Sequence, residues 1–310
     1  MNDRQRLQDL GPILKKRQRL LQIIRAHFSE RGFLEVETPV RLPAPASEDF
    51  IDAEPAGDWF LRTSPELHMK RLLAAGHPRL YQIGPCFRRG ERGRRHQPEF
   101  TMLEWYRADA DYLNILEDTC ELVRSASRQL NGQAVGRFAG REIDLALPWV
   151  EMTVDEAFQR LAGRTLADLL RAAPGEFERT LVEEVEPRLP TDRAVILRDY
   201  PAPFGGLARR CPERPDRVER WELYLGGLEI ANAYSELTDA AEQRQRFLAS
   251  QELRRRESRT VYPADERFFD ALTAGMPPSG GIALGIDRLL MVLADVPDIA
   301  GVMAFPNEQV

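Results

Sequence analysis

Several residue types and patterns that mark common protein classes are scarce or absent in this chain of 310 residues. It has only three cysteines and no CxxC pair, so it supports neither a disulfide framework nor a cysteine zinc site. No apolar run approaches the ~18 to 20 residues of a membrane span. The charged N-terminus lacks the apolar core and cleavage site of a secretory signal. The sequence therefore predicts a cytoplasmic protein with no membrane partner.

The common signatures of nucleotide binding and hydrolysis are also missing. The sequence contains no Gly-Lys dipeptide for a Walker loop, no GxGxxG after a strand, and neither HExxH nor GxSxG. Only three of the 43 Lys and Arg residues are lysines, which leaves little scope for a lysine nucleophile. The net charge of −6 argues against a protein that coats nucleic acid through bulk electrostatics. Any bound nucleotide must be held by another architecture.

Apolar spacing and turn residues indicate where helices and strands lie. The predicted helices cover 13–28, 113–123, 176–189 and 239–256, and the predicted strands cover 33–39, 79–87, 100–107, 194–201, 218–225 and 228–234. Hairpins and helices without regular βαβ alternation predict an α+β fold, with an antiparallel sheet flanked by helices. We expect one domain from residue 12 to 310. Within it, residues 140–217 form an insertion whose secondary structure the sequence pattern indicates less clearly, with a capping box at Thr153 and Glu156.

Two segments carry residues that suit phosphate binding. The loop after residue 87 has five arginines within eight residues, and arginine binds phosphate through two parallel charge-assisted hydrogen bonds. The segment GGIALGIDR (280–288) reads as a glycine-rich turn that leads into an apolar helix, with Arg288 near the helix start. Either pattern alone is also typical of a solvated loop or an ordinary turn.

Glu229 and Glu236 form a candidate acidic pair, because carboxylates on an open sheet face can bind a hard cation such as Mg²⁺. A regular strand would place two residues seven positions apart on opposite faces. A metal shared by both carboxylates therefore requires a bulge or a bend near Asn232.

Three segments in order resemble the motifs of class II aminoacyl-tRNA synthetases, in particular the lysyl-tRNA synthetase branch. They are RGFLEVETP (31–39), FRRGERGRRHQPEFTMLEWY (87–106) and GGIALGIDRLLM (280–291). The resemblance extends from about residue 12 to 306. The first-motif helix begins near Gly11. The anticodon-binding domain of a lysyl enzyme is therefore expected to be missing. With TSPE, HxPEFTMLEWYR and ELTDAAEQRQRF, the chain resembles the elongation factor P lysine ligases, which attach (R)-β-lysine to a lysine of elongation factor P.

This resemblance implies both a reaction and its partners. ATP and Mg²⁺ are the expected cofactors, and the amino acid carboxylate would attack the α-phosphate to give an acyl-adenylate and pyrophosphate. A lysine ε-amine of elongation factor P would then attack the adenylate, which forms an amide bond and releases AMP. Lysine or β-lysine is the expected small substrate, tRNA is not an expected partner, and the family is dimeric through the first-motif helix and Pro39.

The resemblance also assigns roles to individual residues. Arg88 matches the arginine that binds the α-phosphate, and Arg288 matches the arginine at the γ-phosphate end, so both are expected to be catalytic. The implied ATP contacts are Arg88, Arg89, Gly90, Glu91, Gln97, Glu229, Ile230, Gly285 and Arg288. The implied amino-acid contacts are Ser64, Pro65, Glu66, Tyr106 and Glu236, and the implied metal ligands are Glu229 and Glu236.

Three positions depart from the lysyl-tRNA synthetase pattern. Gly90 stands where the pattern has glutamate, with Glu91 displaced by one position, and Gln97 replaces an asparagine. Ala283 stands where the lysyl enzymes usually have glycine, and its methyl group is expected to favour a β-amino acid. Two alternatives remain at this point: a lysine–tRNA ligase without its anticodon domain, and a non-catalytic paralogue that senses an amino acid.

Overall fold

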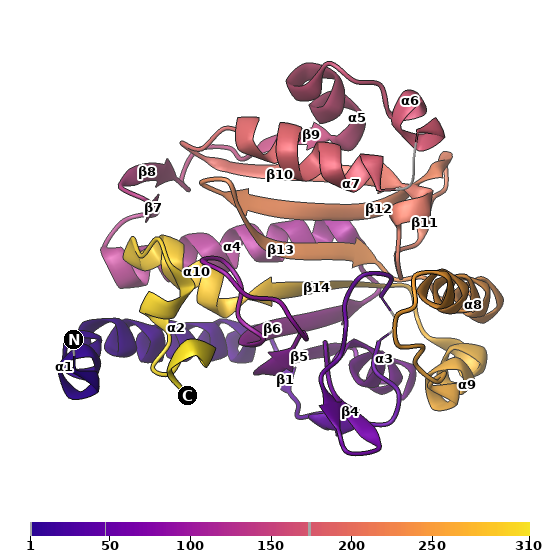
Figure 1. The fold of residues 1–310 in the computed structure, drawn as a ribbon, viewed down its shortest axis with the longest axis horizontal. Coiled ribbons are helices and arrows are strands. Elements are labelled where there is room, and N and C mark those ends of the chain that lie inside the picture. The colour runs from indigo at the N-terminus through magenta and orange to yellow at the C-terminus, as the bar shows by residue number, and fades with distance from the viewer. Residues whose placement is uncertain (1, 47, 173–174) are drawn as a thin grey trace.

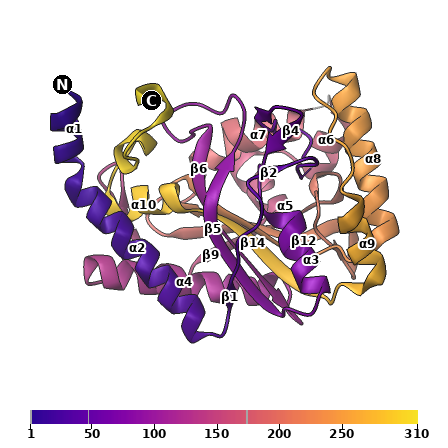
Figure 2. The same cartoon turned by 90° about the horizontal axis from the view of Figure 1, so that it is seen from below.

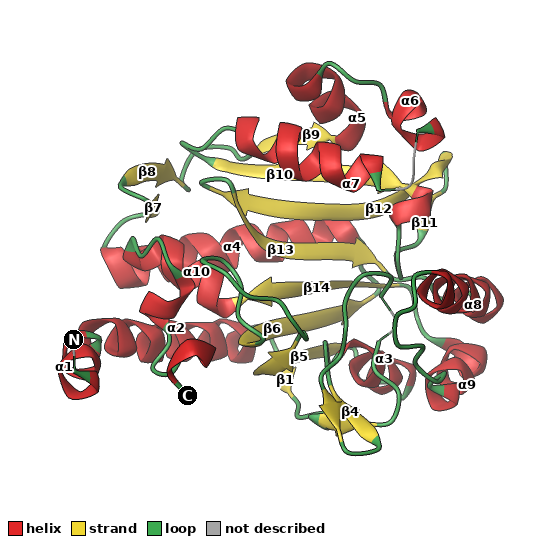
Figure 3. Cartoon of the chain, in the orientation of Figure 1, coloured by secondary structure: helices red, strands yellow, loops and turns green. Residues whose placement is uncertain are grey.

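The structure is a computed structural model that describes residues 2–46, 48–172 and 175–310. Nine strands of the described chain form one sheet at its centre (Figures 1 and 3). From edge to edge they are β1 (Leu34–Glu35), β5 (Arg79–Phe87), β6 (Glu99–Ala108), β14 (Ser279–Gly285), β13 (Leu228–Ser235), β12 (Arg214–Leu225), β10 (Ala194–Pro201) and β9 (Val150–Thr153), with β11 (Arg210–Cys211) beside β12. The inner pairs are antiparallel, and β1 with β5 and β9 with β10 are parallel. The predicted α+β fold is confirmed.

Three amphipathic helices cover one face of this sheet: α2 (Gly11–Glu30), α4 (Tyr112–Asn131) and α10 (Ile286–Ala294). Their apolar side chains pack with those of the central strands in the largest core cluster, which includes Leu103 and Trp105 of β6. Because side chains alternate along a strand, Met102, Glu104 and Tyr106 point to the opposite face. That face carries a large cavity.

Other helices lie at the two ends of the sheet. Helices α3 (Glu66–Ala74), α8 (Ala240–Arg256) and α9 (Glu266–Gly275) lie at the end opposite α1 (Asp3–Asp9), as Figure 2 shows. A small sheet of β2 (Arg41–Leu42), β4 (Trp59–Leu61) and β3 (Pro55–Ala56) precedes α3, and the hairpin β7 (Val135–Phe138) and β8 (Arg141–Asp144) follows α4. No helix in the described ranges is long and apolar enough to cross a membrane.

The predicted insertion contributes directly to the main sheet, because β10 pairs with β12. It also contains α5 (Val154–Ala157), a π-turn (Phe158–Ala162), α6 (Leu166–Arg171) and α7 (Glu176–Thr180). The predicted capping box is confirmed, since the Thr153 side chain accepts from the Glu156 N–H and the Glu156 side chain accepts from the Thr153 N–H. The continuous helix predicted over 176–189 is wrong. Its α-helical part ends at Thr180 and is followed by a short π-helix (Leu181–Val185) and a 3₁₀ helix (Glu186–Arg188). The regular helix cannot continue through Pro187, because proline cannot donate a helical hydrogen bond.

The glycine-rich turn predicted at residue 280 is also wrong, because these glycines lie in strand β14. A Cβ at Gly280 would come within 2.6 Å of the Asp111 carbonyl oxygen, and one at Gly281 would contact Glu236 and Tyr106. Glycine is therefore needed for close approach between elements rather than for a turn. By contrast, Gly226 and Gly227 do form the predicted hairpin turn, with φ of 61° and 77°.

Candidate active site

A cavity of about 1110 Å³ lies on the open face of the sheet. Its walls come from β6, β12, β13 and β14, from Pro45 and residues 48–51, and from the arginine-rich loop between β5 and β6. Arg88 and Arg288, two hundred positions apart in the sequence, both line it. Ser64, Glu66 and Tyr106 line it as well, so the fold brings residues of the second motif (87–106), the third motif (280–291) and the TSPE segment to one site.

A β-bulge decides which side chains of β13 reach this cavity. Leu223 pairs with Ala231 and Tyr224 pairs with Glu229, so Ile230 is the extra residue of the bulge. The bulge changes the alternation, so that Glu229, Asn232 and Tyr234 all line the cavity. Such a bulge is what allows Glu229 and Glu236, seven positions apart, to share one face of the sheet.

The bulge does not bring Glu229 and Glu236 to one metal ion, however. A strand rises about 3.3 Å per residue, so seven positions separate their carboxylates by roughly 20 Å. Glu236 is buried beside Lys70, whereas Glu229 forms an ion pair of 3.3 Å with Arg288. The expectation of a shared Mg²⁺ site is therefore corrected. Among the described residues, no cluster of three or more His, Cys, Asp or Glu side chains could hold a metal ion.

Arg288 joins the start of α10 to two other segments of the site. Its Nη1 donates to the Glu229 carbonyl oxygen at 2.9 Å, and its Nε donates to the Arg95 carbonyl oxygen at 3.1 Å. Its Nη2 lies 2.6 Å from Nε2 of His96. Burial and the charge of Arg288 lower the pKa of His96, which favours the neutral imidazole there. Arg288 is therefore held in a fixed position at this end of the cavity.

Arg88 lies in the cavity between an aromatic ring and acidic side chains. Its guanidinium lies over the Phe100 ring, 5.3 Å from the centroid, and its Nη1 is 3.9 Å from a Glu91 oxygen. Its buried Nε has no hydrogen-bond partner within the part of the chain that the structure describes. A buried donor without a partner is costly, so an anionic ligand at this position would be stabilised.

The other predicted ATP contacts fall into two groups. Glu91, Ile230 and Gly285 line the cavity, whereas Arg89 and Gly90 are exposed and do not line it. Gln97 lines the cavity, but its amide bonds to the C-terminal segment: Oε1 accepts from the Asn307 N–H at 2.9 Å and Nε2 donates to Glu308 at 3.1 Å. In this structure the Gln97 amide therefore fastens the chain end to the arginine loop.

The opposite end of the site is acidic, and we call it the acidic cage. It consists of Glu66 on α3, Glu104 and Tyr106 on β6, Tyr234 on β13, and Glu236 just after β13. The Ser64 hydroxyl donates to Glu104 at 2.7 Å, and the Tyr106 hydroxyl donates to the other Glu104 oxygen at 2.9 Å. The Tyr234 hydroxyl donates to Glu66. Pro65 is the N-cap residue of α3 and does not line the cavity.

Burial makes the charged form of this cage costly. It raises the pKa of Glu104 to about 8, with a further contribution from the charge of Glu66. It raises the pKa of Glu236 to about 8 as well, although the neighbouring Lys70 opposes that shift. Such a cage is suited to a ligand that brings positive charge into the cavity.

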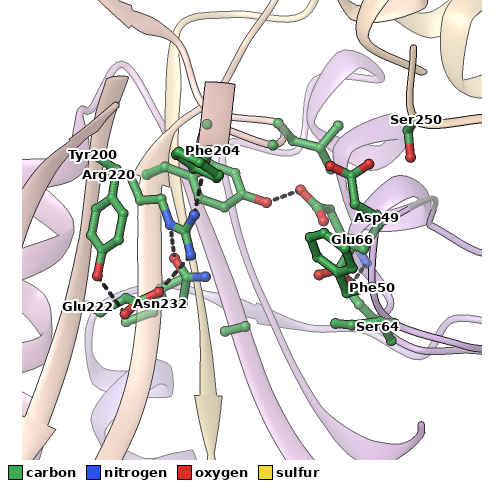
Figure 4. A pocket seen from close by; sticks show the side chains of 18 of the residues that line it. Asp49, Phe50, Ser64, Glu66, Tyr200, Phe204, Arg220, Glu222, Asn232 and Ser250 are labelled. Atoms are coloured by element: carbon green, nitrogen blue, oxygen red, sulfur yellow. Dashed lines mark hydrogen bonds and ion pairs between the residues drawn. The ribbon is translucent and has the colours of Figure 1, made fainter. Parts of the chain in front are cut away.

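Four functional side chains of this site were not found from the sequence: Glu104, Tyr234, Arg220 and Glu222. Glu104 could have been found, because it lies two residues before Tyr106 on the same strand face. Glu222 accepts from the Tyr200 hydroxyl at 2.6 Å and from Arg220 at 2.6 Å (Figure 4). It also accepts from the Tyr224 hydroxyl at 2.7 Å. This cluster lies on neighbouring strands, and no local pattern indicates it.

Glu222, rather than Glu236, is the second carboxylate near Glu229. Burial raises the pKa of Glu222, the charge of Arg220 opposes that shift, and the charge of Glu229 adds to it. Both carboxylates line the cavity, and Glu229 pairs with Arg288 at the arginine end. Because Mg²⁺ commonly binds through one or two carboxylates plus substrate phosphates, this end fits a metal ion that arrives with a polyphosphate.

The sequence profile of the class II tRNA synthetases (D, K and N) matches residues 3–309. The chain belongs to this family. It is 39% identical to a lysine–tRNA ligase of Moorella thermoacetica, over 98% of this chain and 68% of that protein. It is 37% identical to a lysine–tRNA ligase of Synechococcus sp. RCC307, over 96% of this chain and 64% of that protein. A lysine–tRNA ligase of Dehalococcoides mccartyi is 38% identical, with 94% and 63% covered.

These comparisons define the family and the extent of the match. The chain spans about two thirds of the length of the curated relatives that it matches. The relatives are named as ligases, so this is a family of enzymes. The order of the three motifs in the sequence and the geometry of the cavity agree with that membership.

Proposed function

We propose that this protein is a cytoplasmic ligase that activates a lysine-like diamino acid with ATP and Mg²⁺. The observation that carries the proposal is one cavity with arginines at one end and the acidic cage at the other. Arginine recognises phosphate, and buried carboxylates recognise ammonium groups. An amino acid with a second amine and a nucleoside triphosphate can therefore bind together in this cavity, each beside side chains of opposite charge.

The proposed reaction has two steps, activation of the amino acid by ATP and its transfer to an acceptor amine. An oxygen of the amino acid carboxylate attacks the α-phosphorus, and the bond to pyrophosphate breaks to leave an aminoacyl adenylate. An acceptor amine then attacks the carbonyl carbon, which forms an amide, loses a proton and releases AMP. Arg88 stabilises charge at the α-phosphate and Arg288 at the γ-phosphate end, so two anions can approach each other. No side chain forms a covalent bond in this scheme, and catalysis depends on positioning and neutralisation.

Glu229 is the proposed protein ligand of Mg²⁺, with Glu222 beside it. The bound ion would supply charge neutralisation between the phosphate oxygens. Glu222 already accepts three hydrogen bonds, so its part in this site is to hold Arg220 and the strand surface in place.

We propose that the acceptor is a lysine of elongation factor P and that (R)-β-lysine is the preferred amino acid. The segments TSPE, HxPEFTMLEWYR and ELTDAAEQRQRF support this identification. Ala283 adds support, since it lines the cavity and pairs with Glu104 on one side and Asn232 on the other. Its methyl group lies at the floor between the two ends of the site, where the carbon skeleton of the substrate would lie.

A second candidate is transfer of lysine to tRNA, which the names of the relatives favour. The two reactions share the activation step, so the acceptor decides between them. The test incubates the protein with ATP, radiolabelled lysine or β-lysine, and either tRNA or unmodified elongation factor P. We expect label on elongation factor P. Label on tRNA alone would contradict the proposed acceptor, and a lack of lysine-dependent pyrophosphate exchange would instead favour an amino-acid sensor.

A further inference from the structure

Lys70 is unusual in this protein both in its residue type and in its position. Only three of the 43 Lys and Arg residues are lysines, and the other two, Lys15 and Lys16, lie on α2. The Lys70 side chain is 1% exposed. A general preference for arginine does not account for a lysine at a buried position. The contacts of its ammonium group therefore point to a specific task.

The Lys70 ammonium group joins two carboxylates of the acidic cage. Nζ lies 2.5 Å from Oε1 of Glu66, one helical turn earlier on α3, and 2.5 Å from Oε2 of Glu236, just after β13. It also lies 5.3 Å from the centroid of the Tyr234 ring. A compact ammonium can contact three partners in different directions, whereas the planar guanidinium of arginine needs more room.

Lys70 lies behind the wall of the cavity and not in it. Glu66 and Tyr234 line the cavity, whereas Lys70 and Glu236 do not. Lys70 and the Tyr234 hydroxyl both contact Oε1 of Glu66, which leaves Oε2 for a ligand. Oε1 of Glu236 is buried and has no hydrogen-bond partner among residues 2–46, 48–172 and 175–310. Each carboxylate thus has one oxygen near Lys70 and one without a described hydrogen bond.

We propose that Lys70 is a positioning residue for amino-acid recognition: its ammonium group fixes the carboxyl groups of Glu66 and Glu236 in place, so that they attract the ammonium groups of a diamino acid. This inference rests on the proposed function. Lys70 acts through its two neighbours and touches neither substrate nor ATP.

The charges that surround Lys70 show why its loss would weaken binding. The titratable groups that face it are Glu66 on its own helix, Glu104 and Tyr106 on β6, and Tyr234 and Glu236 at the end of β13. Without the ammonium group, three buried carboxylates would have no cation among them. Like charges in a buried site take up protons, and a neutral carboxyl group attracts an ammonium group far less. Arg88 and Arg288 lie at the other end of the cavity, so the activation chemistry itself should be spared.

The test measures amino-acid-dependent pyrophosphate exchange in Lys70→Met, Lys70→Arg and the control Lys15→Met, whose side chain is exposed on α2. For Lys70→Met we expect the KM for lysine and β-lysine to rise about tenfold or more near neutral pH, with kcat and the KM for ATP changed less than about twofold. The deficit should grow between about pH 7 and pH 9, because Glu236, with a pKa of about 8, ionises over this range in the wild type, whereas the loss of Lys70 raises that pKa further. Lys70→Arg should recover part of the affinity, and Lys15→Met should match the wild type.

Three results would overturn the inference: an unchanged KM in Lys70→Met, a KM deficit of equal size at every pH, or a loss confined to kcat. If Lys70→Met does not fold, Lys70→Met/Glu236→Gln removes both buried charges, and its KM should remain raised while its thermal midpoint recovers. Calorimetry of lysine binding to the wild type separates the two proposals. If no lysine or β-lysine binds, both fail; if they bind and Lys70→Met binds equally well, only the role of Lys70 fails.

Discussion

The two ends of the cavity are built from buried side chains of opposite charge, and each end leaves some of its polar atoms unsatisfied. At the end that contains Arg88 and Arg288, the proposed phosphate end, Nε of Arg88 has no partner among the described residues. In the acidic cage, the proposed amine end, the same is true of Oε1 of Glu236. Buried polar atoms without partners cost free energy in the empty protein. A ligand anion beside Arg88 would supply the missing partner there, whereas Glu236 lies behind the cavity wall and can attract a ligand cation only through its charge.

The arginines at the phosphate end should contribute mainly to the transition state. We expect Arg88→Ala and Arg288→Ala each to lower kcat/KM for pyrophosphate exchange by about 10²- to 10³-fold, by analogy with single donors to a developing negative charge. Arg94→Ala is the matched control, since its side chain is 74% exposed on the same loop and pairs with Asp298 only at 3.6 Å. Equal losses in all three variants would indicate that loop charge, and not the two positions, matters.

The buried carboxyl of Glu104 predicts how stability depends on pH. Its pKa is raised from 4.5 to about 8, so between these values the folded protein holds a proton that the unfolded chain has released. The folded state is therefore destabilised as pH rises through this range. We expect Glu104→Gln to lose less stability than the wild type between about pH 5 and pH 8, by a few kcal/mol at most. Denaturant unfolding at both pH values measures this, and parallel pH curves would contradict it.

Ala283 tests which amino acid the cavity prefers. Its side chain lies on β14 between Glu104 and Asn232, so Ala283→Gly removes a methyl group from the cavity floor. We expect the variant to shift the ratio of kcat/KM values toward α-lysine and away from β-lysine by about tenfold, since one methylene in a pocket is worth roughly 1–3 kcal/mol. Competition experiments with both amino acids provide the measurement. An unchanged ratio would show that Ala283 does not determine the preference between α-lysine and β-lysine.

At the scale of elements, the sequence predicts those parts that depend on local pattern. The strands β5, β6, β12 and β13 follow from alternation and turn residues, and α2 and α4 follow from apolar spacing. The bulge at Ile230 and the role of the β14 glycines do not, because they depend on contacts with elements far away in the sequence. The acidic pair shows the consequence: the sequence indicated that Glu229 and Glu236 share a face only if a bulge lies near Asn232, and it could not show that Glu229 lines the cavity while Glu236 lies behind its wall.

The glycines of β14 allow a matched pair of substitutions. At Gly281 a new Cβ would lie within 2.5 Å of both Glu236 and Tyr106, whereas at Gly285 it would meet Arg288 at 3.8 Å, an ordinary contact. We expect Gly281→Ala to lower the free energy of unfolding by about 1–3 kcal/mol through overpacking. Gly285→Ala should change it by less than about 0.5 kcal/mol. Chemical denaturation of the two variants checks this, and equal effects would mean that β14 tolerates both.

At the scale of the whole molecule, the order of strands explains why no single motif revealed the site. β6, β14 and β13 are neighbours in the sheet, although they come from three separate regions of the sequence. The arginine loop follows β5, and Arg288 follows β14, so sheet pairing alone places both at one end of the cavity. Three weak sequence patterns in a fixed order therefore carry more information about function than any one of them, because the fold joins them.

The edge of the sheet at β1 is the place to test the proposed homodimer. Leu34 on β1 is 50% exposed and Val40, next to Pro39, is 37% exposed, so apolar side chains flank the segment through which we propose that two copies pair. Covering such a patch on an open edge strand would stabilise a dimer. We expect sedimentation equilibrium to give twice the chain mass of 35.4 kDa for the wild type and the single mass for Leu34→Asp/Val40→Asp. Leu248→Asp, at a 54% exposed position on α8 at the far end of the molecule, should remain dimeric, and a wild type that sediments as a monomer would contradict the proposal.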